Sequence, residues 1–310
     1  KENKMGRTVI VSKGEKITVK NSWMVVYGDN IESHVPIEDI YSVVIDNRAA
    51  YISVQTVTTL AQAGAAVYFC DEKHIPTAVN LPLNNHCKPF GILKKQLEMS
   101  DDFKKAVWQK IVTAKINNQC KCLSLAGIKK ESIDPIKNLA KQVTLGDSTG
   151  KEATAAKLYF PTLFGPGFFR YLDEVTNAAL NYGYAIMRSS VAKTLVAYGY
   201  NCSLGIHHRN ETNPFNLADD FMEPLRPVVD YWVDSNCDDL LISLTNTNRK
   251  ELVNLINTPI DFDGKKMRIR YAVDRYIQSF TTAVTENDPS KLIVPKLIKP
   301  IFDFEDELDG

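Results

Sequence analysis

SDDFKKAVWQKIVTAKINNQCKCLSLAG, residues 100–127, decides how this chain is organised, because it is the first long helical pattern in the sequence. Ser100 suits the N-cap position, apolar residues recur on one stripe over 103–114, and Gly127 stands where the pattern stops. The stretch therefore predicts one long helix. It also marks the point at which the character of the chain changes.

Short runs rich in Val, Ile, Thr and aromatic residues come before this helix, and turn signals such as Lys-Gly and Gly-Asp-Asn separate them. They predict β structure, interrupted by one helix that ends at Gly64 in SVQTVTTLAQAG, 53–64. The predicted strands are TVIVS (8–12), KITVK (16–20), SWMVVYG (22–28), YSVVID (41–46), AAVYFCD (65–71) and TAVNL (77–81).

The rest of the chain has helical patterns, and we expect a linker at NNHCKP, 84–89. The fold class is therefore α+β, with a small β-rich domain over 5–84 followed by a larger all-α domain over 85–310. Further helices are expected at about 134–143, 151–160, 173–198, 214–232, 248–257 and 266–285.

Composition indicates a globular protein of 310 residues without a membrane partner, since no stretch approaches the roughly eighteen consecutive apolar residues of a membrane span. The N-terminus has no apolar segment of the signal-peptide kind, and the six cysteines include no C-x-x-C pair. The cytoplasm is the expected compartment.

The net charge of zero conceals two opposite local imbalances. Residues 88–130 hold ten Lys and three acids, a balance of +7, whereas residues 219–239 hold seven acids and one Arg, a balance of −6. This separation is typical of a protein that holds an anionic polymer at one surface and a cation at a carboxylate cluster. Solvated helix faces of opposite sign are an equally simple explanation.

Three segments supply candidate ligands for a metal. Glu152 lies in the first turn of the predicted helix 151–160, where a carboxylate also serves as a cap. His207 and His208 are adjacent, so their side chains point in different directions and one of them at most is expected in a given site. Asp220 and Glu223 are three apart on one helix and share a face.

A local conflict favours function over structure for Glu223. An ion pair of Glu223 with Arg226, three residues on, is the structural alternative. However, Pro224 and Pro227 force the helix to kink, or to end and restart, beside the carboxylate. A set of carboxylates and imidazole without cysteine suits Mg²⁺ or Mn²⁺ better than structural zinc. A metal with open positions indicates phosphodiester chemistry.

With these residues in place, the sequence resembles the CRISPR-associated integrase, a metal-dependent DNA endonuclease that inserts spacers into a CRISPR array. The resemblance is carried, in order, by E-x-x-A-A-x-x-Y-F from residue 152, N-x-x-x-N-Y-G-Y from residue 177, L-G-x-x-H from residue 204 and N-L-A-D-D-x-x-E-P-x-R-P-x-V-D from residue 216. It covers nearly the whole chain, including the FCDEKHIP segment at 69–76. GIHHRN and LADDFMEP point to the type II branch.

The resemblance implies a β-sandwich-like N-terminal domain that forms a homodimer and a helical catalytic domain. It implies that Glu152, His208 and Glu223 bind the metal with Asp220 close by, and the spacing Gly-x-x-His selects His208 over His207. The implied reaction is attack of a 3′-hydroxyl on a phosphodiester, without ATP. The implied partners are double-stranded DNA, both prespacer and CRISPR repeat, and a small ferredoxin-like CRISPR protein.

Two positions depart from the family pattern, Ala153 in place of Gly and Lys157 in place of Arg, and both concern DNA contacts more than catalysis. Basic side chains of the helical domain are expected to contact the DNA backbone, with salt-sensitive binding and little base recognition. The candidates are Lys94, Lys95, Lys104, Lys105, Arg188, Lys193, Lys265, Lys266, Arg268 and Arg270. Tyr159 and Tyr182 either stack on DNA or lie in the core.

Two other classes of protein remain open. GDSTG at 146–150 matches the G-x-S-x-G motif of serine hydrolases, but that motif needs a strand before it and a parallel sheet beneath it. A helix cap formed by Asp147, Ser148 or Thr149 is the simpler interpretation. The other alternative is a non-catalytic adaptor, whose DNA binding and stability would ignore EDTA.

Overall fold

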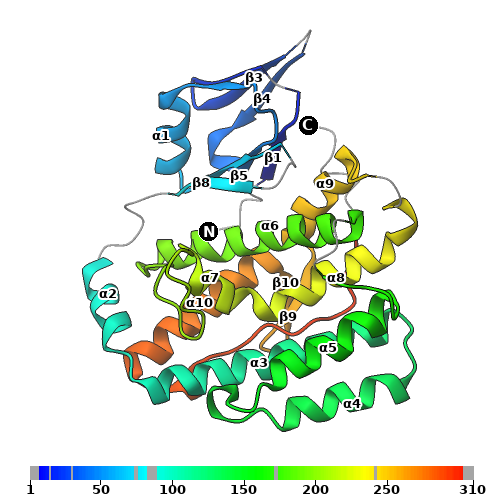
Figure 1. Ribbon diagram of the computed structural model, residues 1–310. Coiled ribbons are helices and arrows are strands. Elements are labelled where there is room, and N and C mark those ends of the chain that lie inside the picture. Colours follow the sequence, from blue (N-terminus) through cyan, green and yellow to red (C-terminus); the bar gives the residue numbers. More distant parts are fainter. Residues whose placement is uncertain are drawn as a thin grey trace.

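The structure is a computed structural model, and it describes residues 7–13, 15–28, 31–72, 76–81, 89–170, 174–240 and 243–302. A β-rich part stands above a larger helical part in Figure 1, and the chain passes from one to the other before α2 (Pro89–Glu98). The predicted α+β class is confirmed. The predicted linker and domain boundary at 84/85 lie outside the described residues.

Two four-stranded sheets form the β-rich part. One has the strand order β1-β5-β7-β8, in which β1, β5 and β7 are parallel and β8 is antiparallel; the other has the order β4-β3-β2-β6. The strands are β1 Arg7–Val11, β2 Lys16–Lys20, β3 Trp23–Gly28, β4 Ile31–Pro36, β5 Ile40–Ile45, β6 Tyr51–Ile52, β7 Ala66–Cys70 and β8 Pro76–Asn80.

The two sheets share one hydrophobic core, as in a β-sandwich. Val43 and Val67 from the first sheet pack with Ile17 and Met24 from the second, and Leu60 of α1 (Val54–Gln62) closes the cluster. Because side chains alternate along a strand, the next residues of β5 and β7 face the opposite way, into the helical part. The first sheet is therefore covered on both faces.

The helical part contains every predicted helix in the predicted order, with small shifts of the helix ends, but α2 was not predicted. The structure divides the predicted helix 214–232 into two helices, separated by a 3₁₀ turn at Glu223–Leu225, as its prolines required. The helices are α3 Asp101–Leu125, α4 Lys130–Lys141, α5 Lys151–Phe164, α6 Val175–Ala197, α7 Asn216–Met222, α8 Arg226–Ser235, α9 Asn246–Asn254 and α10 Ile269–Glu286.

Helix α3 begins as the sequence predicts, because the Ser100 side chain accepts a hydrogen bond from the backbone N–H of Phe103. It is buried over much more than the predicted stripe, since helices α4, α5, α7 and α8 all pack against it. Lys115, Asn118 and Gln119 are buried along with its apolar residues. Some polar residues of this helix therefore lie in the interior of the molecule.

The helical part contains a β-hairpin that the sequence analysis missed. Strands β9 (Pro259–Phe262) and β10 (Lys265–Arg268) pair antiparallel across Asp263 and Gly264, which both have positive φ. Asp-Gly is the preferred dipeptide of such two-residue turns. The prediction of a helix from residue 266 was therefore wrong at its start. No helix of the described residues is long and apolar enough to cross a membrane.

Polar contacts join the first sheet to helices α6 and α9. The Tyr41 hydroxyl of β5 lies 3.0 Å from the Ser190 hydroxyl of α6, and Lys193 donates a hydrogen bond of 2.6 Å to the Tyr41 carbonyl. Asp46, after β5, pairs with Arg249 of α9 at 3.2 Å, and both side chains are at most 10% exposed. Figure 1 shows α6 directly beneath this sheet.

Replacing Asp46 by alanine should lower the free energy of unfolding by about 3 kcal/mol or more, because it leaves the buried Arg249 guanidinium without its carboxylate. Urea unfolding followed by circular dichroism measures the change. Glu72→Ala is the control, because the Arg48–Glu72 pair is exposed and its atoms are 3.9 Å apart. Equal effects of the two substitutions would contradict the prediction.

Candidate metal centre

Glu152 is positioned by the cap of α5. The Asp147 carboxylate accepts hydrogen bonds from the backbone N–H groups of Lys151 and Glu152, at 2.8 and 2.9 Å. This is the cap role predicted for the GDSTG segment, and α4 rather than a strand precedes the segment. A nucleophile elbow is therefore ruled out at this place, and the hydrolase interpretation with it.

Glu223 is positioned by the break between α7 and α8. It lies in the 3₁₀ turn that Pro224 and Pro227 enforce, and its side chain is 5% exposed. Its Oε1 lies 3.0 Å from Nε of Arg226, so the predicted structural alternative, the i,i+3 ion pair, is also present. The break turns this carboxylate toward α3.

Lys115 of α3 links the two glutamates. Its ammonium group donates a hydrogen bond to Oε1 of Glu152 and lies 2.5 Å from Oε2 of Glu223. Lys115 is 7% exposed and Glu223 is 4% exposed. The structure therefore brings together two of the predicted ligands, 71 residues apart in the chain, around one positive charge.

The electrostatics of this group follow from its pairing. Burial lowers the pKa of Lys115, but the Glu223 and Glu152 carboxylates outweigh burial, and the net shift is upward. Burial raises the pKa of Glu223, but Arg226 and Lys115 outweigh it, and the net shift is downward. Lys115 and Glu223 are thus both charged at neutral pH, and each keeps the other charged.

Asp220 is the anchor of the loop that carries the histidines. Its Oδ2 accepts hydrogen bonds from the backbone N–H groups of Ile206 and His207, at 2.6 and 3.1 Å. Its Oδ1 accepts one from the His208 backbone N–H at 3.1 Å and lies 2.7 Å from the His208 Nδ1. With these contacts and no exposed surface, Asp220 holds the loop in place.

The two histidines have different surroundings. The His207 ring stacks on Trp108 of α3, with centroids 4.2 Å apart and planes 3° apart. Burial lowers the pKa of His207, whereas the hydrogen bond with Asp220 raises the pKa of His208. Because Nδ1 of His208 faces Asp220, Nε2 is the nitrogen left for another partner.

His208 also belongs electrostatically to the glutamate group, since the Glu223 carboxylate contributes to its raised pKa. No three His, Cys, Asp or Glu side chains of the described residues surround a single point as ready-made ligands. Instead, the ammonium group of Lys115 lies between the carboxylates of Glu152 and Glu223. Two of the predicted ligands, Glu152 and Glu223, are thus assembled around a cation that the protein itself supplies.

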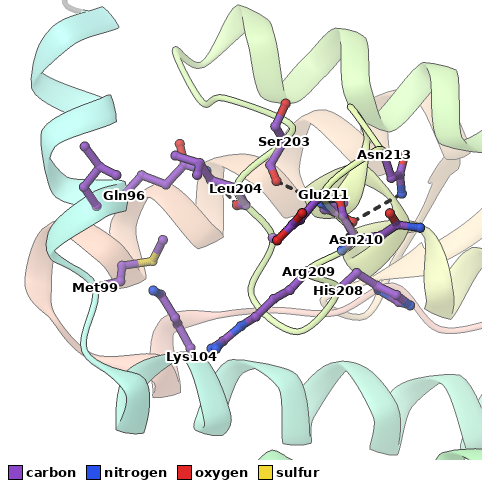
Figure 2. Close-up of a pocket in the computed structure, with 13 residues that line it drawn as sticks. Gln96, Met99, Lys104, Ser203, Leu204, His208, Arg209, Asn210, Glu211 and Asn213 are labelled. Atoms are coloured by element: carbon purple, nitrogen blue, oxygen red, sulfur yellow. Dashed lines mark hydrogen bonds between the residues drawn. The ribbon is translucent and has the colours of Figure 1, made fainter.

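Two cavities border the centre. One of about 200 Å³ is lined by Glu152, Glu223 and Lys115, and by the side chains of Arg226 and Asp230. The other, of about 340 Å³, adjoins His208. Figure 2 shows Lys104 of α3 and Arg209 of the histidine loop extending along the lower side of this second cavity. Both cavities thus have Lys or Arg side chains in their walls, and carboxylates line them as well.

Asp230 also lines the first cavity. Its carboxylate accepts hydrogen bonds from the hydroxyls of Tyr159, at 2.9 Å, and Tyr184. Burial raises the pKa of Asp230 to about 6, and these hydrogen bonds oppose the rise. Tyr159 and Tyr182 are fully buried, so they are core residues and do not stack on DNA.

The structure also tests the predicted DNA contacts. Arg270 is 3% exposed and Lys193 is bound to the Tyr41 carbonyl at the sheet, so the prediction of DNA contacts was wrong for these two residues. Both were mistaken for surface residues because the packing of the sheet on α6 and α10 is invisible in the sequence. The remaining candidates are exposed or half-buried: Lys94, Lys95, Lys104, Lys105, Arg188, Lys265, Lys266 and Arg268.

Substituting Gly205 should displace the histidine loop. A Cβ at this position would overlap the His208 carbonyl oxygen and lie 3.0 Å from Oδ2 of Asp220. Gly205→Ala should therefore destabilise the protein by about 1–3 kcal/mol, the cost of overpacking. Thermal unfolding measures it, with Gly167→Ala as control because a Cβ there meets nothing within 4 Å. Equal melting temperatures of the two variants would contradict the expectation.

Asp230 should make stability depend on pH. Its folded pKa of about 6 lies above the unfolded value of about 3.9, so the folded state binds the proton more tightly. This group therefore adds stability as the pH falls from about 6 to about 4, by up to about 3 kcal/mol. Urea unfolding of wild type and Asp230→Asn across pH 4–7 measures the contribution, because the free energy of unfolding of wild type relative to that of Asp230→Asn should fall as the pH rises. Parallel pH profiles would contradict it.

Comparison with known proteins identifies the relatives of this chain. A family model described as "CRISPR associated protein Cas1" matches residues 8–252. The CRISPR-associated endonuclease Cas1 of Neisseria meningitidis serogroup C is 36% identical over 304 residues, which cover 97% of this chain and 99% of the relative. The CRISPR-associated endonuclease Cas1 1 of Francisella tularensis subsp. novicida is 23% identical and covers 88% and 94%.

Solved structures share the fold. A casposase bound to its integration product superposes with a TM-score of 0.78 at 17% identity, covering 97% of this chain and 98% of that chain. A Cas1 protein from Thermotoga maritima gives 0.74 at 13% identity, covering 90% and 97%. A Cas6-RT-Cas1–Cas2 complex gives 0.75 at 19% identity, covering 96% and 37%.

Proposed function

The chain belongs to the Cas1 family of CRISPR-associated endonucleases, and from that premise we propose that it is a divalent-metal-dependent integrase that inserts spacer DNA into a CRISPR array. The observation that carries the proposal is the convergence of Glu152 and Glu223 on one buried cation, with His208 held beside them by Asp220. An adaptor without catalysis has no need of such a centre.

The residues are suitable for Mg²⁺ or Mn²⁺. The donors are two carboxylates and one imidazole, which hard divalent cations accept, and among the described residues no cysteine lines the cavity that Glu152 and Glu223 share. The Lys115 ammonium shows that a positive charge is stable between Glu152 and Glu223. We assign these glutamates and Nε2 of His208 as ligands. Asp220 was predicted as a fourth ligand, but since its oxygens already accept several hydrogen bonds, we assign it the positioning of His208.

The proposed reaction is a transesterification. When bound, the metal neutralises charge on the phosphate under attack and polarises it. The 3′-hydroxyl oxygen of the captured DNA forms a bond to phosphorus, the phosphodiester bond to the neighbouring 3′ oxygen of the repeat strand breaks, and the proton of the attacking hydroxyl ends on that leaving oxygen. Bond energy is conserved, so ATP is not required. Lys104 and Arg209 are suitably placed to hold the backbone.

The proposal extends to partners. Solved relatives are complexes named Cas1–Cas2, which supports assembly of this chain with a small ferredoxin-like partner and with double-stranded prespacer and repeat DNA in the cytoplasm of a prokaryote. We assign homodimer formation to the domain over 5–84 and catalysis to that over 85–310. The Neisseria relative and the GIHHRN and LADDFMEP segments support the type II branch.

Strand transfer tests the proposal. A 3′-hydroxyl DNA fragment is offered with a repeat-containing plasmid, the small partner and Mn²⁺, and joined product is quantified on a gel. Glu152→Gln, His208→Ala and Glu223→Gln should each reduce joining by more than the roughly 10–100-fold loss expected for the supporting residue Asp220→Asn. EDTA should abolish joining by the wild type, and added Mn²⁺ should restore it.

His207→Ala is the matched control, because His207 stacks on Trp108 and is not bonded through its ring to Asp220. It should retain most activity. Circular dichroism and DNA binding in EDTA verify that each variant is folded. No joining by wild type, together with DNA binding that ignores EDTA, would favour the adaptor instead. Joining that ignores EDTA, or that survives the loss of Glu223, would contradict the metal-dependent mechanism.

A further inference from the structure

A buried lysine at the centre of the proposed metal site needs an explanation. Lys115 is 7% exposed, and the Glu152 and Glu223 carboxylates are the charged partners of its ammonium group within 4 Å. A lysine without these partners would lose its charge or leave the interior, because burying an unpaired ammonium group is expensive. Its position is therefore set by the same two carboxylates that we assign to the metal.

The charges around the neighbouring cavity balance without a metal. The lining side chains include the cations Lys115, Arg170 and Arg226 and the carboxylates Glu152, Glu223 and Asp230. Three positive and three negative charges give a sum of zero when all are ionised. A divalent cation added to this set would bring the sum to +2, close to the Lys115 ammonium.

Two cations cannot share the gap between these carboxylates. The ammonium group is in hydrogen-bond contact with one oxygen of each glutamate, and oxygen atoms that bind a metal at about 2.0–2.2 Å must approach closer still. An ammonium retained at this place would touch the metal and be repelled by it. Binding of the metal thus requires the lysine to move.

We propose that Lys115 is an internal competitor for the divalent metal, paired with Glu152 and Glu223 in the metal-free protein and displaced when the metal binds. The inference rests on the proposed function, because it concerns the same site. It goes beyond it by giving the metal-free protein a stable, self-neutralised form. The apparent affinity of the two glutamates for metal is thereby lowered by the free energy needed to release the ammonium.

The displaced side chain has a place to go. The cavity of about 200 Å³ opens beside Lys115 and is lined by Gln119, whose buried Oε1 has no hydrogen-bond partner among the described residues. The four-carbon chain of a lysine is flexible, so its ammonium group can turn into this space while the α3 backbone stays fixed. With the metal bound, the cavity then carries an excess positive charge, which a DNA phosphate can neutralise.

Direct metal binding tests the proposal without any measurement of activity. Mn²⁺ is titrated into the full-length protein, and free Mn²⁺ is measured by electron paramagnetic resonance. Lys115→Met keeps the length of the side chain and removes its charge, so it should bind Mn²⁺ at least tenfold more tightly than wild type. Lys121→Met is the matched control, since Lys121 is an exposed residue of the same helix, and it should bind as wild type does.

Thermal unfolding gives a second measurement, in which Lys115→Met should weaken the metal-free protein although it strengthens metal binding. In EDTA, Lys115→Met should melt at a lower temperature than wild type, because the two carboxylates lose their shared cation, and Mn²⁺ should raise its melting temperature more than that of wild type. A lysine with only a structural role would lower stability without improving metal binding. Equal or weaker Mn²⁺ binding by a folded Lys115→Met would overturn the proposal.

Wild type provides an independent test if Lys115→Met does not fold. A crystal structure with Mn²⁺ should show the Lys115 ammonium out of contact with both glutamates; an ammonium still in contact with Glu223 beside bound Mn²⁺ would refute the competition. Glu223→Gln separates the two proposals. If wild type binds no Mn²⁺, or Glu223→Gln binds it equally well, the metal site itself fails, whereas normal Glu223-dependent binding unaffected by Lys115→Met overturns only the competition.

Discussion

One ammonium group between two carboxylates fixes the centre of this molecule. Lys115 comes from α3, Glu152 from the start of α5 and Glu223 from the turn between α7 and α8. Lys115 and Glu223 are the more buried members of this group, and each stabilises the charge of the other in the interior. The relative positions of these elements are therefore coupled, and the carboxylates are held at a separation that accommodates a cation between them.

The histidine loop depends on a different force and is joined to this centre through α7. Asp220 and Glu223 are three residues apart, and the sequence predicted one shared face. In the structure they contact different neighbours. Asp220 accepts hydrogen bonds from the backbone N–H groups of residues 206–208, whereas Glu223 pairs with Lys115 of α3. The 3₁₀ turn begins at Glu223, so it tightens the backbone there and not at Asp220. One short helix therefore aligns the loop with the ion group.

Local signals explain which features the sequence predicted. Ser100 and the prolines after Glu223 act on their immediate neighbours, so the start of α3 and the break before α8 followed from residue type alone. Lys115 was missed because a lysine on a helix is normally solvated, and only the packing of four other helices buries this one. Arg270 was wrongly assigned to the DNA-binding surface for the same reason, because the long-range packing that buries it cannot be read from the sequence. The hairpin after Phe262 had its Asp-Gly signal, but the helix pattern that follows obscured it.

The backbone around the centre leaves side-chain motion as the simplest way to exchange one cation for another. The Asp147 cap holds the start of α5, Pro224 fixes the turn at Glu223, and the crowded Gly205 allows the histidine loop little freedom. Moving any of these segments would break several hydrogen bonds at once, at about 1 kcal/mol or more each. Rotating Lys115 breaks only its own contacts, which an arriving divalent cation replaces with stronger attraction to the same oxygens. A rigid backbone with one mobile charged side chain therefore lets the site exist with and without metal while the fewest contacts are broken.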